Sequence, residues 1–195
     1  VGKGPGCPGD GSGWAFFQGT SMSTPHIAGS AAVLLGLHST WTPAQIKSAL
    51  VNRADLVVKD ATTGLQAVGP TAQGAGRENL SVAADATTWM DPVSASFGRV
   101  TLGHPTTVSI TLFNPTGSPQ IFSISKSKFD AGNITPGDDR ITVPPTIAVP
   151  ANGSVTLPVT VNTGQPAGSV IQGWITLDGS GSNDLHFAYY AIVGR

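Results

Sequence analysis

The stretch SVTLPVTV, residues 154–161, alternates strictly between two kinds of side chain. The apolar positions are Val155, Leu157, Val159 and Val161. A period of two residues is typical of a β-strand with one face in a core and the other in solvent. The stretch therefore predicts a half-buried strand.

The same signal recurs along the C-terminal half of the chain, between turn-forming segments such as NPTGS and VNTG. The pattern predicts strands over 95–101, 106–113, 120–126, 141–148, 154–162, 169–178 and 185–193. Several short alternating strands with regular turns favour an all-β antiparallel sandwich, which we place at residues 89–195. The Cys…Trp…Cys spacing of an immunoglobulin domain is absent, so the sandwich is expected to resemble a fibronectin type III domain.

The N-terminal part of the chain follows a helical pattern. A helix is predicted from Ser21 to about Leu37, and its apolar residues cover nearly every face, so we expect it to be buried all round. A second helix is predicted over 41–54, because Thr42 is a good N-cap, Pro43 suits the first helical position and Gln45 completes a capping box.

The remaining N-terminal elements are short. Residues 14–17 (WAFF) are a strand candidate, residues 60–76 are expected to be loop, and 77–86 read as one more short helix. The pattern changes near Thr88. We therefore expect two parts, an α/β portion at 1–88 and the sandwich at 89–195.

Composition limits the classes of function. Charged residues make up only 11% of the 195 residues and the formal net charge is −1, against about 25% charged residues in typical soluble domains. This balance excludes a basic surface for nucleic acid or for anionic membrane. A single cysteine, Cys7, rules out a disulfide within the chain, and no apolar run approaches the length of a membrane span.

Ser21 is the candidate for chemistry. It stands in a Gly-Thr-Ser turn that runs directly into the first helix, in the string GTSMSTPHIAG of residues 19–29. A serine before a helix is most often an N-cap. The alternative is a nucleophile, because free backbone N–H groups at a helix start stabilise a developing oxyanion.

The whole string decides between these alternatives. It matches, position by position, the serine box of the subtilisin-like serine proteases, G-T-S-M-[SA]-x-P-H-[VI]-A-G. The segments TPAQIKSALVNRA (42–54) and GAGRENLSVAADA (74–86) are similar to the end of the catalytic domain in that family. The resemblance covers about residues 14–87.

The resemblance implies roles for four residues. Ser21 would be the nucleophile, and its N–H would form half of the oxyanion hole. Thr20 would support that hole, and Gly19 and Met22 would complete the substrate-binding residues. Gln18 departs from the Ser or Asn more often seen at its position in the family.

His26 is not expected to be the base. Five residues along a helix correspond to about 500° of rotation, which turns its ring about 140° away from Ser21. A packing role is predicted instead. In subtilisin-type chains the order is Asp, His, Ser, so the resemblance implies that the acid, the base and the oxyanion-hole asparagine lie upstream of Val1.

The expected function is that of a secreted serine endopeptidase in the intact parent protein, with this chain alone inactive. The expected partners are a protein or peptide substrate and the N-terminal part of the catalytic domain, without nucleic acid or membrane insertion. The alternative is a non-catalytic binding or adhesion module that carries a protease remnant. No cofactor is expected and no metal ligand is assigned, although structural calcium in the parent stays open.

Two further patterns concern acidic and aromatic residues. The acidic loop residues in PGDGSG (8–13) and GDDR (137–140) are more often turn formers than calcium ligands. The aromatic residues Trp174, Phe187, Tyr189 and Tyr190 are expected to belong partly to the sandwich core, with a sugar or peptide contact as the alternative.

Overall fold

The computed structural model describes residues 19–57, 68–180 and 183–195. Four helices come first: α1 Thr20–Leu37, α2 Pro43–Asn52, α3 Pro70–Gln73 and α4 Leu80–Ala84. The first five strands are β1 Trp89–Asp91, β2 Ala95–Thr101, β3 Thr106–Asn114, β4 Gln120–Asp130 and β5 Asn133–Pro136. The other five are β6 Ile141–Thr142, β7 Thr146–Val149, β8 Gly153–Val161, β9 Val170–Asp178 and β10 Leu185–Gly194.

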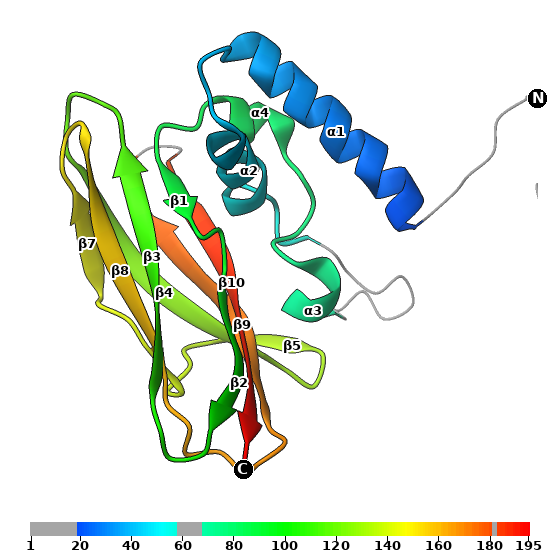
Figure 1. Cartoon of the computed structure of the whole chain (residues 1–195), viewed down its shortest axis with the longest axis vertical. Helices are drawn as coiled ribbons and strands as arrows, with labels where there is room; N and C mark the ends of the chain where they lie inside the picture. Colours follow the sequence, from blue (N-terminus) through cyan, green and yellow to red (C-terminus); the bar gives the residue numbers. More distant parts are fainter. Residues whose placement is uncertain (1–18, 58–67, 181–182) are drawn as a thin grey trace, which may run out of the picture.

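The strands form a β-sandwich, as predicted. One sheet has the order β1-β3-β8-β6, and the other has the order β2-β10-β9-β4-β5 with β7 also pairing with β4. Figure 1 shows the two sheets packed face to face, with the helices gathered beside one of them. The stretch at 154–161 lies in β8, where Leu157 and Val159 are fully buried in the sandwich core.

One pairing departs from the antiparallel prediction. β2 runs parallel to β10, with Tyr189 opposite Ala95 and Val193 opposite Val100. The chain leaves the first sheet after β1 and joins the second sheet as β2, so β2 lies at the edge of the second sheet and runs in the same direction as the last strand.

The predicted strand over 141–148 is two strands in different sheets. β6 pairs with β8, and β7 pairs with β4. Pro144 and Pro145 stand between them, and proline has no N–H for a strand ladder. The break lets the chain cross from one sheet to the other.

Two strands were not predicted. β1 is only three residues long, which is too short for an alternating pattern. β5 pairs with the end of β4, which runs four residues beyond its predicted limit of 126. Lys126 and Lys128 interrupt the apolar alternation there, so the sequence pattern does not predict that the strand continues to Asp130.

The second helix has the predicted capping box. The backbone N–H of Thr42 donates to Gln45 Oε1 at 2.7 Å, and Gln45 N–H donates to Thr42 Oγ1 at 3.3 Å. The short helix predicted over 77–86 is α4, with Asn79 as its N-cap. Residues 70–73, predicted as loop, form the single turn α3.

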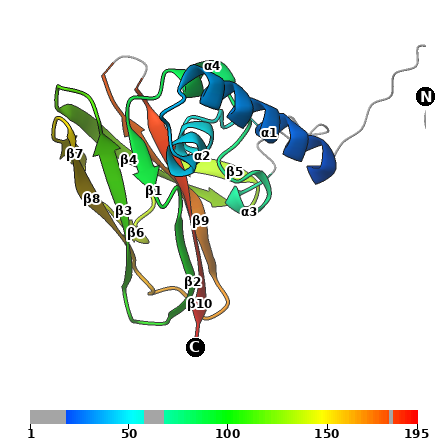
Figure 2. The same ribbon diagram turned by 45° about the horizontal axis from the view of Figure 1, so that its top comes forward.

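The first helix differs from its prediction. α1 is not buried all round: Ser30 and Leu34 are its buried residues, whereas Ile27, Val33 and Leu35 are 44–48% exposed. Figures 1 and 2 show α1 as the outermost element, touching the rest of the protein along one side. This chain supplies α2 and α4 as packing partners, and they cover only that side.

The structure before Trp89 is helical in its described residues, apart from an isolated bridge between Asp55 and Arg77. The strand candidate at 14–17 lies outside the described residues, so the α/β character of residues 1–88 stays a prediction. The bridge also explains why a glycine stands at position 76. Gly76 has φ +117°, and a Cβ there would meet the carbonyl O of Asp55 at 2.2 Å.

Candidate functional site

The site predicted from the serine box lies at the start of α1. Gly19 is the N-cap, with φ +134°, a conformation that disfavours any residue with a side chain. The N–H groups of Met22 and Ser23 donate to the Gly19 carbonyl at 3.0 and 3.1 Å. The N–H groups of the first helical residues, Thr20 and Ser21, precede these bonds and have no intrahelical acceptor.

Ser21 is therefore not the N-cap. It is the second residue of the helix, and the cap position, Gly19, makes no side-chain capping bond. Ser21 is exposed, and it lies in the first turn of an 18-residue helix, whose N-terminal end carries a partial positive charge. This arrangement suits a nucleophile better than a capping residue.

The neighbouring hydroxyls are engaged by the helix itself. Thr24 Oγ1 donates to the carbonyl of Thr20 at 2.8 Å, and Ser23 Oγ donates to that of Gly19 at 3.3 Å. Met22 is half-buried and Thr20 is exposed. The hydroxyls of Ser23 and Thr24 are thus bonded to the helix backbone, whereas those of Thr20 and Ser21 make no hydrogen bond within the described residues.

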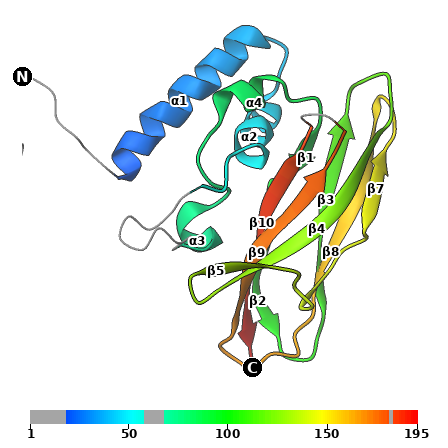
Figure 3. The ribbon, with the colours of Figure 1, turned by 180° about the vertical axis from the view of Figure 1, so that it is seen from behind.

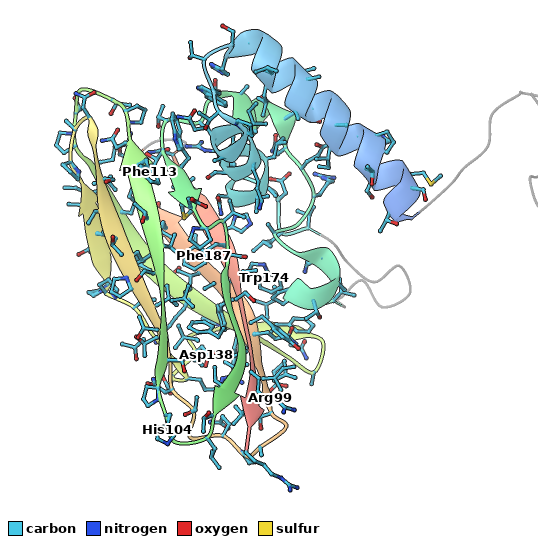
Figure 4. The ribbon with its side chains drawn as sticks, in the orientation of Figure 1. Arg99, His104, Phe113, Asp138, Trp174 and Phe187 are labelled. Atoms are coloured by element: carbon cyan, nitrogen blue, oxygen red, sulfur yellow. The ribbon has the colours of Figure 1, made fainter. Side chains whose placement is uncertain are left out.

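The histidines of the chain lie in the described residues, and none of them is placed as a base. His26 Nδ1 lies 2.7 Å from the carbonyl O of Met22, so the ring is bonded to its own helix. Its side chain is exposed in this chain, so the predicted packing role is not seen here. His38 contacts the Ala84 carbonyl at 2.8 Å, and His186 contacts that of Ala75 at 2.7 Å. Figure 4 shows His104 at the end of the sandwich far from α1.

An apolar groove of about 930 Å³ opens below the exposed side of α1. It is lined by Ile27 and Leu35 of α1 and by Ile46 and Leu50 of α2. It continues past residues 70–76 to Ala95 and Tyr190 of the sandwich. The groove is thus lined both by the sandwich and by the part of the chain before it, residues 19–57 and 68–88, which we call the helical segment.

In the GDDR segment, Asp138 is engaged by partners within the chain. Asp138 is 3% exposed and accepts from Arg140 Nε and Nη2, both at 2.7 Å, and from the Tyr189 hydroxyl at 2.6 Å. Burial alone would raise the pKa of Asp138, but these hydrogen bonds outweigh it and hold the pKa below its usual value. Across the part of the chain that the structure describes, no three His, Cys, Asp or Glu residues gather as a metal site. The motif at 8–13 lies outside that part.

The aromatic residues belong partly to the sandwich core, as predicted. Phe187 and Tyr189 are in the core between the two sheets, as expected, and Figure 4 shows Phe187 there. Trp174 is also fully buried, but it lies on the opposite face of β9, where its indole N–H donates to the carbonyl of Gly74 at 3.0 Å. It packs edge-on against Phe129, with ring centroids 6.2 Å apart. Trp174 is thus covered by the helical segment, and no aromatic platform for a ligand is formed there.

The sequence did not predict the contacts between the helices and the sandwich. Asn52 is fully buried on α2, and its amide donates to the carbonyls of His186 and Val93 at 2.9 and 3.0 Å. Both acceptors are backbone atoms of residues far away in sequence. The only sign of these contacts in the sequence is that a polar residue, Asn52, stands at the end of a helix.

The comparisons with known proteins agree with the serine box. Residues 10–88 match the sequence model of the Subtilase family. The minor extracellular protease Vpr of Bacillus subtilis is 30% identical over 166 residues, which cover 84% of this chain and 20% of Vpr. The subtilisin-like protease SBT5.6 of Arabidopsis thaliana is 39% identical over 111 residues, or 54% of this chain and 13% of that protein. The chain therefore spans about a fifth or less of the length of these relatives.

Solved structures resemble the sandwich at a lower level. A PapD-like domain of human CEP192 covers 55% of this chain, with 10% identity and a TM-score of 0.44, and 85% of that domain is matched. The MSP family member WR4 of C. elegans covers 56% of this chain, with 12% identity and a TM-score of 0.37, and 99% of that protein is matched. No conclusion about function follows from likenesses at this level.

The described residues contain no helix that is long and apolar enough to cross a membrane. The string at 19–29, the helix that it begins and the matches to proteases of two kingdoms lead to one assignment. Residues 10–88 of this chain belong to the subtilase family.

Proposed function

We propose that this chain is the C-terminal part of a subtilisin-like catalytic domain followed by a fibronectin type III-like sandwich, and that the parent protein is a secreted serine endopeptidase. The boundary between the two parts is proposed near Thr88. The name of the relative Vpr, an extracellular protease, supports secretion. The observation that carries the proposal is Ser21, exposed in the first turn of α1 directly after the Gly19 turn.

In the proposed reaction, Ser21 Oγ attacks the carbonyl carbon of a peptide bond while a base removes the hydroxyl proton. The negative charge that develops on the carbonyl oxygen is stabilised by the N–H of Ser21, and Thr20 supports this position. The amine product leaves with a proton, and water then hydrolyses the acyl-enzyme. Gly19 and Met22 line the proposed substrate cleft.

The base and acid are proposed to come from the remainder of the parent polypeptide. The histidines of this chain lie away from Ser21 or are bonded elsewhere. The apolar groove beneath α1 supplies a surface for that polypeptide, because Ile27 and Leu35 are nearly half exposed there. Burying such side chains is favourable by about 25 cal/mol per Å² of apolar surface.

The proposal is tested in the parent protein with a matched pair of variants. Ser21→Ala is expected to reduce peptide hydrolysis by several orders of magnitude. Ser23→Ala removes a hydroxyl that bonds only to its own helix, so it is expected to retain activity within a few-fold. Equal activity of Ser21→Ala and wild type would overturn the assignment of Ser21.

A further inference from the structure

The second face of the β9–β10 pair is buried around Trp174 and His186, which is unusual for a free-standing sandwich. In β9, Ile171, Ile175 and Leu177 point into the core between the sheets. Trp174, on the opposite face, is also fully buried. An antiparallel sheet in an independent sandwich commonly leaves its outer face to solvent. Here that face is covered by residues 68–76 and by α2, which Figure 3 shows lying against β9 and β10.

The outer face donates hydrogen bonds to the backbone of the helical segment. Trp174 Nε1 donates to the Gly74 carbonyl at 3.0 Å, and His186 Nε2 lies 2.7 Å from the carbonyl of Ala75, one residue later. These two carbonyls belong to the Gly-Ala-Gly turn that precedes α4. Each bond removes one way for the turn to change its conformation, so the turn depends on the sandwich for its position.

A closed polar network joins α2 to both sheets. The backbone N–H of Met90, in β1, donates to Ser48 Oγ at 2.8 Å, and Ser48 Oγ donates to Asn52 Oδ1 at 2.8 Å. Asn52 in turn donates to the carbonyls of Val93 and His186. Ser48 and Asn52 are at most 1% exposed. Fully satisfied buried networks of this kind specify one arrangement, because any other leaves polar groups unpaired.

Aromatic contacts extend the connection to α1. The ring of His38, directly after α1, stacks on Trp41 with centroids 3.9 Å apart and planes 5° apart. Trp41 contacts Trp89 of β1 at 5.7 Å. Through these rings and Leu34, the helix that begins at Ser21 is held against α2, which is itself held on the sandwich.

We infer that the sandwich completes the fold of the helical segment: the β9–β10 face is the surface on which residues 42–57 and 68–88 fold, and the Ser48–Asn52 pair fixes α2 to it. Its partner is thus this chain's own helical segment, rather than an external ligand. The inference concerns folding of this chain and holds whether or not Ser21 is a nucleophile.

Native-state hydrogen exchange on the wild-type chain tests the inference directly. At increasing denaturant, the amides of α2 and of β9 are expected to converge on the same opening free energy, because they unfold together. Exchange of α2 in a separate, less stable unit, with β9 unaffected, would overturn the inference. This measurement needs no variant.

Single substitutions then test whether Asn52 connects α2 to the sandwich. In Asn52→Ala, protection of the amides in α2, in residues 74–77 and in β9 is expected to fall at least tenfold more than that of the β3–β8 pair, which lies in the other sheet. Lys47→Ala is the matched control, since Lys47 is exposed on the same helix, and it is expected to leave the pattern unchanged. Equal effects of the two variants would contradict the inference.

A milder variant keeps the test usable if Asn52→Ala does not fold. Trp174→Phe keeps an aromatic ring under the helical segment but removes the indole N–H, so protection is expected to fall mainly around residues 74–77. Phe113→Leu, at an exposed position of the other sheet, is its control. Unchanged protection around 74–77 in Trp174→Phe would show that the bond to Gly74 does not hold the turn.

Discussion

The imidazole of His186, in β10, lies 2.7 Å from the carbonyl oxygen of Ala75, in the turn before α4. The two residues are 111 positions apart in the sequence. Their contact lies where the sandwich meets the helical segment. His186 is 9% exposed. Burial lowers its pKa below the usual value, although the Ala75 carbonyl and Asp55 act in the opposite direction.

The burial of His186 predicts a loss of stability in mild acid. The unfolded chain takes up a proton on this histidine near pH 6.5, whereas the folded chain does so only at lower pH. The free energy of unfolding is therefore unaffected well above pH 6.5 and falls as the pH drops below it, by at most about 1.4 kcal/mol per pH unit. Urea unfolding at intervals between pH 8 and pH 5 measures the slope. His186→Gln is expected to flatten it, and His104→Gln, at an exposed turn, is not; a wild-type stability that is constant across this range would contradict the prediction.

The buried Asp138–Arg140 pair predicts a second effect, at lower pH. Asp138→Ala is expected to destabilise the chain by about 3–5 kcal/mol, because it leaves a partly buried guanidinium and the Tyr189 hydroxyl without their partner. Because the pKa of Asp138 is held down in the folded state, its contribution is present above about pH 4 and is lost as the pH falls through the folded pKa. Asp139→Ala, at the exposed neighbouring position, is the control. Similar urea midpoints for the two variants would show that the pair contributes little.

The packing of α1 predicts different costs for two adjacent leucines. Leu34 is fully buried against α2 and α4, whereas Leu35 is 48% exposed. Leu34→Ala is expected to cost about 2–4 kcal/mol, and Leu35→Ala less than about 1 kcal/mol, in the isolated chain. Thermal and urea unfolding of both variants measure this difference. In the parent protein, the cost of Leu35→Ala is expected to rise, since the proposed catalytic-domain chain covers that side.

Two glycines are expected to respond in opposite ways to alanine. Gly76→Ala is strained at φ +117° and places a Cβ 2.2 Å from the Asp55 carbonyl, so a loss of about 2 kcal/mol or more is expected. Gly36, within α1, has open space around its Cβ position. Gly36→Ala is therefore expected to stabilise the chain by about 0.5–1 kcal/mol. Differential scanning calorimetry measures both changes, and a stabilising Gly76→Ala would contradict the described bridge between Asp55 and Arg77.

The sandwich was largely predictable because alternation is a local signal. β2 was predicted at its observed bounds and β8 to within one residue. The prediction failed where the deciding contact is distant in sequence. Nothing local to residues 141–148 shows that the chain changes sheets, and nothing local to β2 shows that it runs parallel to β10.

The start of α1 was predictable for a different reason. Gly19 and Ser21 stand in a fixed local motif, so their turn and helix start follow from adjacent residues. The role of Trp174 did not follow, because strand alternation alone places a buried aromatic residue in the core. Its burial on the other face depends on Gly74, one hundred positions earlier. The base and acid proposed for Ser21 likewise do not follow from the residues around it.

The central claim is that Ser21 is a nucleophile that needs partners from the remainder of the parent polypeptide. Labelling with a fluorophosphonate probe, followed by mass spectrometry of the modified peptide, tests it most directly. We expect stoichiometric modification of Ser21 in the active parent protein and none in this chain alone. Stoichiometric labelling of Ser21 in this chain alone, or labelling of the parent at a different serine, would contradict the claim.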